Sequence, residues 1–149
     1  MIQRLREIIA TGIAASLLAA CSGERPTNLG IRDGRLSDCP HSPNCVASQM
    51  ADTGHLIAPL AFRDTPESAF ARLRETLAHR SDTKIIKEGN GYLQVEFRTR
   101  LFVDDGEFLL GQGYIHVRSA SRLGYSDLGK NRNRMEEIRR EFSQSETQP

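Results

Sequence analysis

Apolar and polar residues alternate along the C-terminal two thirds of the chain with a period of two residues. In the segment Tyr92–Arg98, Leu93, Val95 and Phe97 alternate with polar or amphipathic neighbours. This alternation is typical of a strand with one buried face. Similar but less regular patterns, separated by glycine-rich turns, predict three further strands: Thr83–Glu88, Leu101–Leu110 and Tyr114–Ser119.

A helical period appears in two other segments. The first helix is expected to begin with Thr65 as N-cap and Pro66 at its first position, and to end near Arg80. The second is expected from about Lys130 to Ser143. Apolar residues recur on one face of each helix, at Phe70, Leu73 and Leu77 in the first and at Met135, Ile138 and Phe142 in the second.

We also expect a short edge strand at His55–Leu60, limited to an edge by Pro59. The predicted order is β-α-β-β-β-β-α. Tight turns between strands favour an antiparallel sheet, so the sequence predicts an α+β fold with a four- to five-stranded antiparallel sheet packed on two helices. This layout resembles helix-grip or TBP-like folds, in which a curved sheet wraps a long C-terminal helix. Such a likeness of fold does not fix a function.

Three acidic residues, Asp104, Asp105 and Glu107, lie in the segment Leu101–Leu110. Either the sequence DDG forms a hairpin turn there, or the acids lie on an exposed edge strand, where charge discourages pairing with another chain. Together with Asp52 they could hold a hard cation, although they lack the spacing of a calcium-binding loop. We assign no metal site and no cofactor.

The N-terminus has the pattern of a bacterial lipoprotein signal. Two arginines precede the apolar run Ile8–Ala20, which is too short to span a bilayer. The run ends in the sequence LAAC, a lipobox, so we expect residues 1–20 to be removed and Cys21 to be lipidated. Ser22 in place of aspartate favours the outer membrane, with the domain facing the periplasm. The alternative is a short buried helix with an unrelated cysteine.

The remaining chain divides into three segments. Residues 21–38 are rich in Gly, Pro, Asn and charge and are expected to form a tether. Residues 39–143 form a single α+β domain, and residues 144–149 a polar tail. Without Arg4, Arg6 and Glu7 the chain has 18 basic and 18 acidic side chains (20 − 2 and 19 − 1). This neutral balance gives no electrostatic case for a nucleic-acid partner, so the expected partner is the membrane, through the lipid on Cys21.

Cys39 and Cys45 frame the sequence CPHSPNC. In the oxidising periplasm a pair of cysteines is most simply a disulfide. Free thiols, or a zinc site completed by His41 and His55, are the alternatives. The C-x₅-C spacing matches no common zinc knuckle.

Three stretches, CPHSPNCVASQ, VDDGEF and GYIHVRSASRLGYSDLGKNRNRMEEIR, together resemble the bacterial and plastid family known as domain of unknown function 1499. The resemblance covers about Leu36 to Phe142. Gly106 stands where the family's acidic strand is expected to have an apolar residue, which calls the continuity of that strand into question. The resemblance implies a small secreted or lipid-anchored domain, and it implies no activity.

Basic residues accumulate between the last strand and the last helix. Guanidiniums that meet at a helix N-terminus, with its free N–H groups and partial positive charge, suit a phosphate or carboxylate. The candidate anion-binding residues are Arg118, Ser119, Ser121, Arg122, Tyr125, Asp127, Asn131, Arg132 and Arg134. The alternative is a polar corner in which Asp127 caps the helix or pairs with an arginine and Tyr125 packs against the domain.

Three functions fit these patterns. The one we favour is a binding module for an anionic or amphiphilic small molecule, or for an envelope partner. The second is an envelope hydrolase that uses a metal or assembles Ser119 or Ser121 with His116 or His55 and Asp127, although no G-x-S-x-G elbow is present. The third is a structural lipoprotein. The deciding geometry is whether the guanidiniums of Arg118, Arg122 and Arg132 converge on an open cavity.

Overall fold

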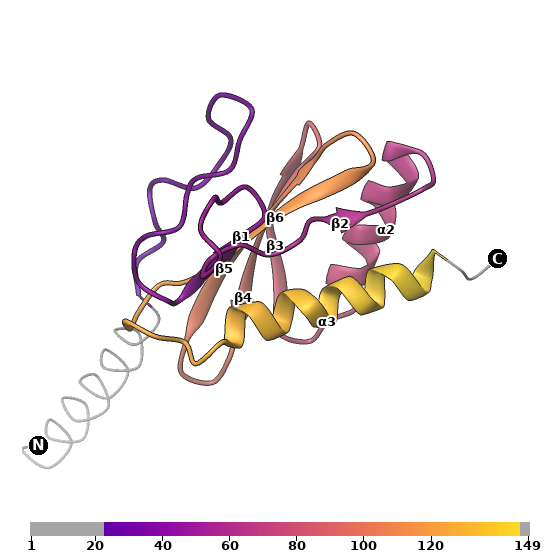
Figure 1. The fold of residues 1–149 in the computed structure, drawn as a ribbon. Coiled ribbons are helices and arrows are strands. Elements are labelled where there is room, and N and C mark those ends of the chain that lie inside the picture. Colours follow the sequence, from indigo (N-terminus) through magenta and orange to yellow (C-terminus); the bar gives the residue numbers. More distant parts are fainter. Residues whose placement is uncertain (1–22, 147–149) are drawn as a thin grey trace, which may run out of the picture.

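A computed structural model describes residues 23–146 of the chain. In chain order the elements are β1 (Cys45–Ala47), β2 (Leu60–Ala61), α2 (Pro66–Ala78), β3 (Thr83–Gly89), β4 (Tyr92–Arg98), β5 (Val103–Leu110), β6 (Tyr114–Ser121) and α3 (Lys130–Ser145), as Figure 1 shows. The expected signal peptide, Cys21 and the end of the tail lie outside the described residues. Between residues 23 and 146, no helix has the length and apolar character needed to cross a membrane.

The strands form one antiparallel six-stranded sheet in the order β1-β6-β5-β4-β3, with β2 also paired to β6. The predicted α+β class and the order of the main elements are confirmed; the helix-grip or TBP-like label stays a prediction. The strand expected at His55–Leu60 is wrong in detail. Only Leu56 bridges to Ala47, and β2 begins at Leu60. The three-residue β1 is too short to show an alternating pattern and was missed.

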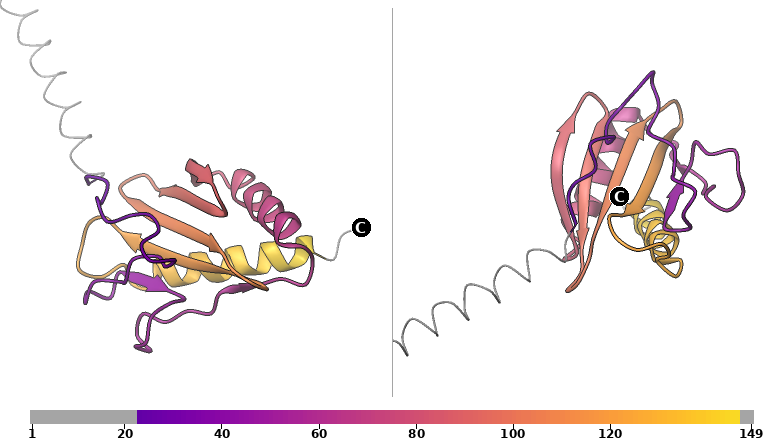
Figure 2. Two further views of the ribbon diagram at one scale, coloured as in Figure 1. Left: turned by 90° about the horizontal axis from the view of Figure 1, so that it is seen from above. Right: turned by 90° about the vertical axis from the view of Figure 1, so that its left-hand side faces the viewer.

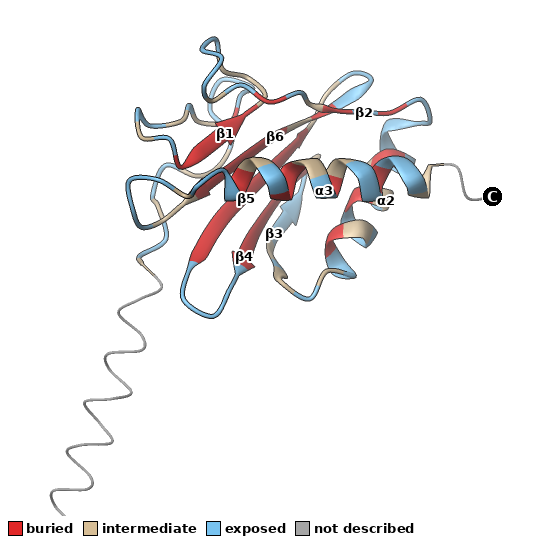
Figure 3. Ribbon diagram, turned by 60° about the horizontal axis from the view of Figure 1, so that its bottom comes forward, coloured by how far each residue is buried: buried red, intermediate tan, exposed pale blue. Residues whose placement is uncertain are grey.

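Both helices cover one face of the sheet. The N-cap predicted at Thr65 is present, because its Oγ1 accepts a hydrogen bond of 3.2 Å from the N–H of Ser68. The apolar stripes predicted for the helices lie in the core with the inward-facing strand residues (Figure 3), which include Leu73, Leu77, Leu93, Val95, Phe97, Phe108, Ile115, Val117, Met135, Ile138 and Phe142. Each large side chain buried in this way contributes roughly 1.5–3 kcal/mol to folding.

Strand β5 runs without interruption through Gly106, which pairs with Val95 on β4 and Ser119 on β6. Of the alternatives considered for this segment, the hairpin turn is therefore wrong, and the strand is continuous at Gly106, where its continuity was in question. Glycine is required there for space: a Cβ at this position would lie 2.4 Å from Cε2 of Phe97. The aromatic ring occupies the place where another strand residue would have a side chain.

The second face of the sheet is covered by the N-terminal segment 23–38, which was expected to be a tether. The N–H of Gly30 donates to Glu107 of β5 over 2.7 Å, and Leu36 packs with Tyr92 and Leu109. Figure 2 shows this segment crossing the sheet on the side away from α2. The tether prediction fails for these residues because their contacts with the sheet are mainly polar and leave no apolar pattern in the sequence.

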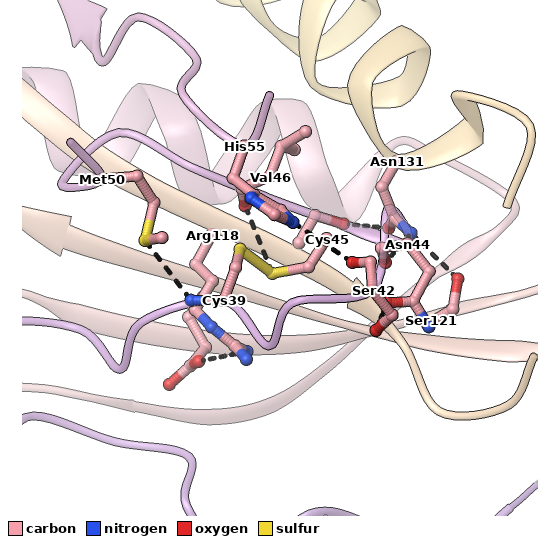
Figure 4. The surroundings of a disulfide bond; sticks show 12 residues. Cys39, Ser42, Asn44, Cys45, Val46, Met50, His55, Arg118, Ser121 and Asn131 are labelled. Atoms are coloured by element: carbon pink, nitrogen blue, oxygen red, sulfur yellow. Dashed lines mark hydrogen bonds and ion pairs between the residues drawn. A yellow bond between two sulfur atoms is a disulfide. The ribbon is translucent and has the colours of Figure 1, made fainter. Parts of the chain in front are cut away.

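A disulfide between Cys39 and Cys45 fastens the N-terminal segment to β1 (Figure 4). The Cα atoms of the two cysteines are 5.6 Å apart. This pairing confirms the predicted disulfide and removes the thiolates that the zinc alternative needs. His41 is exposed, and His55 contacts Asp52 and the carbonyl oxygen of Ser42 instead.

Candidate functional site

A network of carboxylates and guanidiniums lies between the sheet and the N-terminal segment. Glu96 extends from β4, Asp105 and Glu107 from β5, and Arg118 from β6, with Arg122 one residue beyond β6. The acids are buried in the middle of the sheet, because β5 lies between β4 and β6. The interpretation of these acids as an exposed edge is therefore wrong.

Glu107 is fully buried and has three hydrogen-bond partners. Its Oε2 accepts from Arg118 over 3.2 Å, and its Oε1 accepts from the N–H of Gly30 and, over 2.8 Å, from the hydroxyl of Tyr92. Burial, followed by the charge of Glu107, raises the pKa of Tyr92. The phenol therefore remains a neutral donor at any physiological pH.

Arg122 binds two carboxylates. Its Nε lies 2.8 Å from Oδ2 of Asp105, and its Nη2 lies 2.7 Å from Oδ1 of Asp105 and 2.6 Å from Oε1 of Glu96. The hydrogen bonds to Asp105 are the main cause that raises the pKa of Arg122. Burial would raise the pKa of Glu96, but hydrogen bonds from Arg25, Arg122 and Arg98 lower it to about 2. Glu96 is therefore a carboxylate at neutral pH, and Arg122 a guanidinium.

Arg134 of α3 lies on the opposite face of the sheet from this network. It donates to Asp104 over 2.8 Å, and its guanidinium lies over the ring of Phe97 at 4.5 Å from the centroid. Its Nη1 also donates to Oδ1 of Asn131 over 3.2 Å. A guanidinium with a carboxylate, an amide and an aromatic face is held as part of the packing of α3 on the sheet.

The N-terminus of α3 is occupied by a carboxylate of the chain itself. Oδ1 of Asp127 accepts from the N–H of Gly129 over 2.9 Å, and Oδ2 accepts from the N–H of Asn131 over 2.8 Å. The side chain of Asn131, fully buried, then links Ser119 and Ser121 of β6 to the helix. The N–H groups of Gly129 and Asn131 at this helix start are thus already bound by Asp127, as in the polar-corner alternative.

The remaining candidates do not complete an anion site. Arg132 donates to the carbonyl oxygens of Leu56 and Gly54 over 2.9 and 2.8 Å, and Tyr125 is exposed rather than packed. The predicted residues lie along β6, the β6–α3 loop and the start of α3, but Arg118 and Arg122 are on one face of the sheet and Arg134 is on the other. The guanidiniums of Arg118, Arg122 and Arg132 do not converge on an open cavity, so the geometry on which anion binding depended is not formed.

The predicted serine–histidine–aspartate assembly is not formed either. Ser119 and Ser121 contact Asn131, and no histidine lies between them and Asp127. His55 pairs with Asp52 over 2.7 Å, while its Nε2 lies 3.2 Å from the carbonyl oxygen of Ser42 and is unavailable as a base.

One serine–histidine contact was not predicted from the sequence. Oγ of Ser48 lies 3.2 Å from Nδ1 of His116 and accepts the N–H of Val117 over 3.0 Å. Burial lowers the pKa of His116. Within residues 23–146 no carboxylate hydrogen-bonds this imidazole, so the pair lacks the third member of a catalytic triad. Ser48 and His116 are 68 positions apart, and no local spacing points to them.

In the part of the chain that the structure describes, no group of three or more His, Cys, Asp or Glu side chains has the arrangement of a metal site. Asp104, Asp105 and Glu107 are directed at guanidiniums instead. The carboxylates therefore balance arginine charge within the domain, and this pairing accounts for the acids of β5 without a metal ion.

A pocket of about 380 Å³ lies between the β4–β5 turn and the β6–α3 loop. We call it the loop pocket. Its apolar walls are Phe102, Leu123 and Leu128, and polar groups are supplied by Ser121, Ser126, Asp127 and Lys130, among others. Two larger hollows, of about 630 and 680 Å³, lie along α2 and are wider open to solvent, with charged linings. The loop pocket thus combines apolar walls with polar groups, as small-molecule sites do.

Comparison with known proteins identifies a family but no individual relative. A family model described as a protein of unknown function (DUF1499) matches residues 35–142. No curated protein and no solved structure matches the chain. The matched range includes all strands, α2, the residues that line the loop pocket, and α3 as far as residue 142.

Proposed function

The chain belongs to the DUF1499 family, and on that premise we propose that it is an outer-membrane lipoprotein whose periplasmic domain binds an amphiphilic small molecule in the loop pocket. The observation that carries this proposal is the lining of that pocket. Phe102, Leu123 and Leu128 form apolar walls around an opening that also has polar groups. Such a combination suits a molecule with an apolar body and a polar end.

The arrangement favours an amphiphile over a simple anion. Arg118, Arg122 and Arg134 are paired with carboxylates, so they are not available to an external phosphate. The cation at the loop pocket is Lys130, whose ammonium is exposed. A head group hydrogen-bonded by Lys130 and Ser126, with its chain against Leu123, would use the polar and apolar parts of the lining together.

Two observations support the envelope as the location. The lipobox ending at Cys21 is the sequence signal for lipidation. The Cys39–Cys45 disulfide suits an oxidising compartment such as the periplasm, because the cytosol keeps thiols reduced.

Fractionation tests the anchor. The wild-type protein is expected with the membranes and Cys21→Ser in the soluble fraction, because the thiol is the acceptor of the lipid. Intact-mass analysis of the wild type should show a chain that begins at Cys21 with added acyl groups. A Cys21→Ser protein that remains in the membranes, or an unmodified wild-type cysteine, would overturn the lipoprotein assignment.

Binding of a single-chain phospholipid tests the pocket. We would titrate a non-lipidated protein that comprises residues 22–149 with lysophosphatidylglycerol below its micelle-forming concentration. Leu123→Asp places a charge in the apolar wall and should weaken binding at least about tenfold, since burial of a large apolar side chain is worth more than 1.4 kcal/mol.

Tyr114→Asp is the matched control. Tyr114 is similarly exposed but lies at the other end of β6, roughly 20 Å from Ser121. The Tyr114→Asp variant should bind lysophosphatidylglycerol as the wild type does. If the wild type does not bind, or if both variants weaken binding equally, the proposed pocket is not a ligand site.

A further inference from the structure

Exposed apolar side chains gather at one end of the domain. Five of the eight large hydrophobic residues that are exposed within residues 23–146 belong to the β4–β5 turn or the β6–α3 loop. We call these five the apolar tip; they are Leu101, Phe102, Leu123, Tyr125 and Leu128. Leu128 is 94% exposed and Tyr125 75% exposed, so neither contributes to the core. A cluster of this kind marks a surface that meets another apolar phase.

Ordered loops display these side chains. In the β4–β5 turn the N–H of Thr99 donates to the carbonyl of Phe102 over 2.9 Å, and Oγ1 of Thr99 accepts the N–H of Phe102 over 3.1 Å. In the β6–α3 loop Asn44 donates to the carbonyl of Gly124 over 2.6 Å. Leu128 has a φ of 54°, a backbone conformation that residues other than glycine rarely adopt. The loops thus direct leucines and aromatics into solvent instead of folding them inwards.

The tip adjoins the point where the described chain begins. A Cβ added to Gly23 would lie 2.9 Å from Cβ of Arg122 and 3.1 Å from Cγ of Leu123, so the backbone of Gly23 rests on the β6–α3 loop. Figure 1 shows the described chain beginning beside this loop. Cys21 is two residues upstream, and two residues span at most about 7 Å. A lipid on Cys21 would therefore enter its membrane close to the apolar tip.

The charges around the tip suit a lipid surface. Arg100 and Lys130 are exposed beside it, one in each loop region, whereas the carboxylate of Asp127 is bound to the start of α3. Basic residues next to apolar tips fit the anionic head groups and the acyl boundary of a bilayer.

We propose that the apolar tip enters the head-group region of the membrane that holds Cys21, so that the loop pocket opens toward the bilayer and takes its amphiphile from it. This inference rests on the proposed lipid anchor and pocket. Phe102, Leu123 and Leu128 connect the two, because they line the pocket and are exposed at the tip. The surface that the tip contacts is the lipid bilayer; the competing partner is a second copy of the chain.

Vesicle flotation of the non-lipidated protein of residues 22–149 tests the tip without the anchor. The vesicles contain phosphatidylethanolamine and phosphatidylglycerol. Leu101→Ser with Tyr125→Ser removes apolar area at the tip and leaves the lining of the loop pocket intact. The double variant should partition at least about tenfold more weakly than the wild type.

The matched control replaces two exposed apolar residues elsewhere, Ile31→Ser with Tyr114→Ser, and should float with the vesicles as the wild type does. Failure of the wild type to float, or equal flotation of the tip variant, would overturn the inference. So would concentration-dependent dimerisation, measured by sedimentation, that the tip variant abolishes.

A fluorescent reporter gives an independent reading. The chain has no tryptophan, so Leu101→Trp places a single indole at the tip and Tyr114→Trp places one at the far end of β6. Addition of vesicles should shift the emission of Leu101→Trp to the blue and leave Tyr114→Trp unchanged. The absence of a shift at position 101 contradicts membrane contact. Binding of lysophosphatidylglycerol by Leu101→Ser with Tyr125→Ser should stay as in the wild type, so that failure of the tip is distinguishable from failure of the pocket.

Discussion

Arg122 and Asp105 form a bidentate ion pair between the sheet and the N-terminal segment. The Nε–Oδ2 and Nη2–Oδ1 distances are 2.8 and 2.7 Å, and the two side chains are 6% and 1% exposed. A guanidinium and a carboxylate that are buried together satisfy each other and cannot serve a solvent-borne anion. The pair therefore identifies the arginine-rich corner as part of the fold.

Loss of one partner of this pair should be costly. Arg122→Met leaves Asp105 and Glu96 buried without their cation, and we expect the free energy of unfolding to fall by about 3–5 kcal/mol. Chemical denaturation followed by circular dichroism measures it. Arg98→Met is the control: Arg98 also contacts Glu96 but is 54% exposed, so its loss should cost less than about 1 kcal/mol. Equal effects of the two variants would contradict a buried network.

Acid should weaken the network through Glu96. Its pKa is lowered from 4.5 to about 2 in the folded protein. A carboxyl with a depressed folded pKa stabilises the fold above its unfolded pKa, and this contribution is lost as the pH falls from about 5 toward 2. The shift corresponds to roughly 3 kcal/mol. Denaturation at pH 7, 5, 4 and 3 should show that the free energy of unfolding falls more steeply with acid in the wild type than in Glu96→Gln. Parallel dependences on pH would refute the lowered pKa of Glu96.

Much of the fold could be predicted from the sequence, because its signals are periodic. Strand β4 was predicted to the residue, and the starts of α2 and α3 were placed by Thr65-Pro66 and by Lys130. The covering of the second sheet face could not be predicted. The alternation in β4 suggested one solvent-exposed face, yet Gln94 and Glu96 are buried, and Glu96 accepts a hydrogen bond from Arg25, 71 positions away. Polar contacts of that kind produce no periodic pattern in the sequence.

The candidate site shows the same division. The sequence placed the arginines at the correct corner, since strand end and helix start are local features. It could not pair Arg118 with Glu107 or Arg134 with Asp104, because these partners come from a different strand. The loop pocket was missed because its walls, such as Phe102 and Leu128, belong to loops with no pattern of their own.

Gly106 should tolerate no side chain. Gly106→Ala would place Cβ against the ring of Phe97 and against Val95, which forces a shift in the packed sheet. We expect a loss of about 1–3 kcal/mol in the free energy of unfolding. Gly54→Ala, in a loop where the nearest contact of a Cβ is 3.4 Å, should change it by less than about 0.5 kcal/mol. A neutral Gly106→Ala would show that β5 and Phe97 are not packed as described.

Reduction of the disulfide should loosen the N-terminal segment. The Cys39–Cys45 link closes a small loop, so its removal should cost about 2 kcal/mol. Hydrogen exchange of the Gly30 amide, which donates to Glu107, should accelerate in the reduced protein. Amides in the middle of β4 serve as the internal control. Unchanged protection of Gly30 would mean that the disulfide does not hold this segment to the sheet.

His55 should titrate above its ordinary range. The hydrogen bond to Asp52 raises the pKa of its imidazole. A raised folded pKa stabilises the fold below the unfolded value, and this contribution is lost as the pH rises through the folded pKa. NMR titration of the imidazole should give a lower pKa in Asp52→Asn than in the wild type. Identical titration curves would contradict the 2.7 Å pair.

The most direct test of the account is NMR mapping of ligand binding on the ¹⁵N-labelled protein of residues 22–149. Lysophosphatidylglycerol, added below its micelle-forming concentration, should shift amides around the loop pocket, at Phe102, Ser121 and the residues 123–130. Amides of Glu96, Glu107 and Arg118, and of the hollow between α2 and α3 near Arg80, should remain unchanged. Shifts confined to either of those regions, or no shifts at all, would contradict the claim that the loop pocket is the binding site.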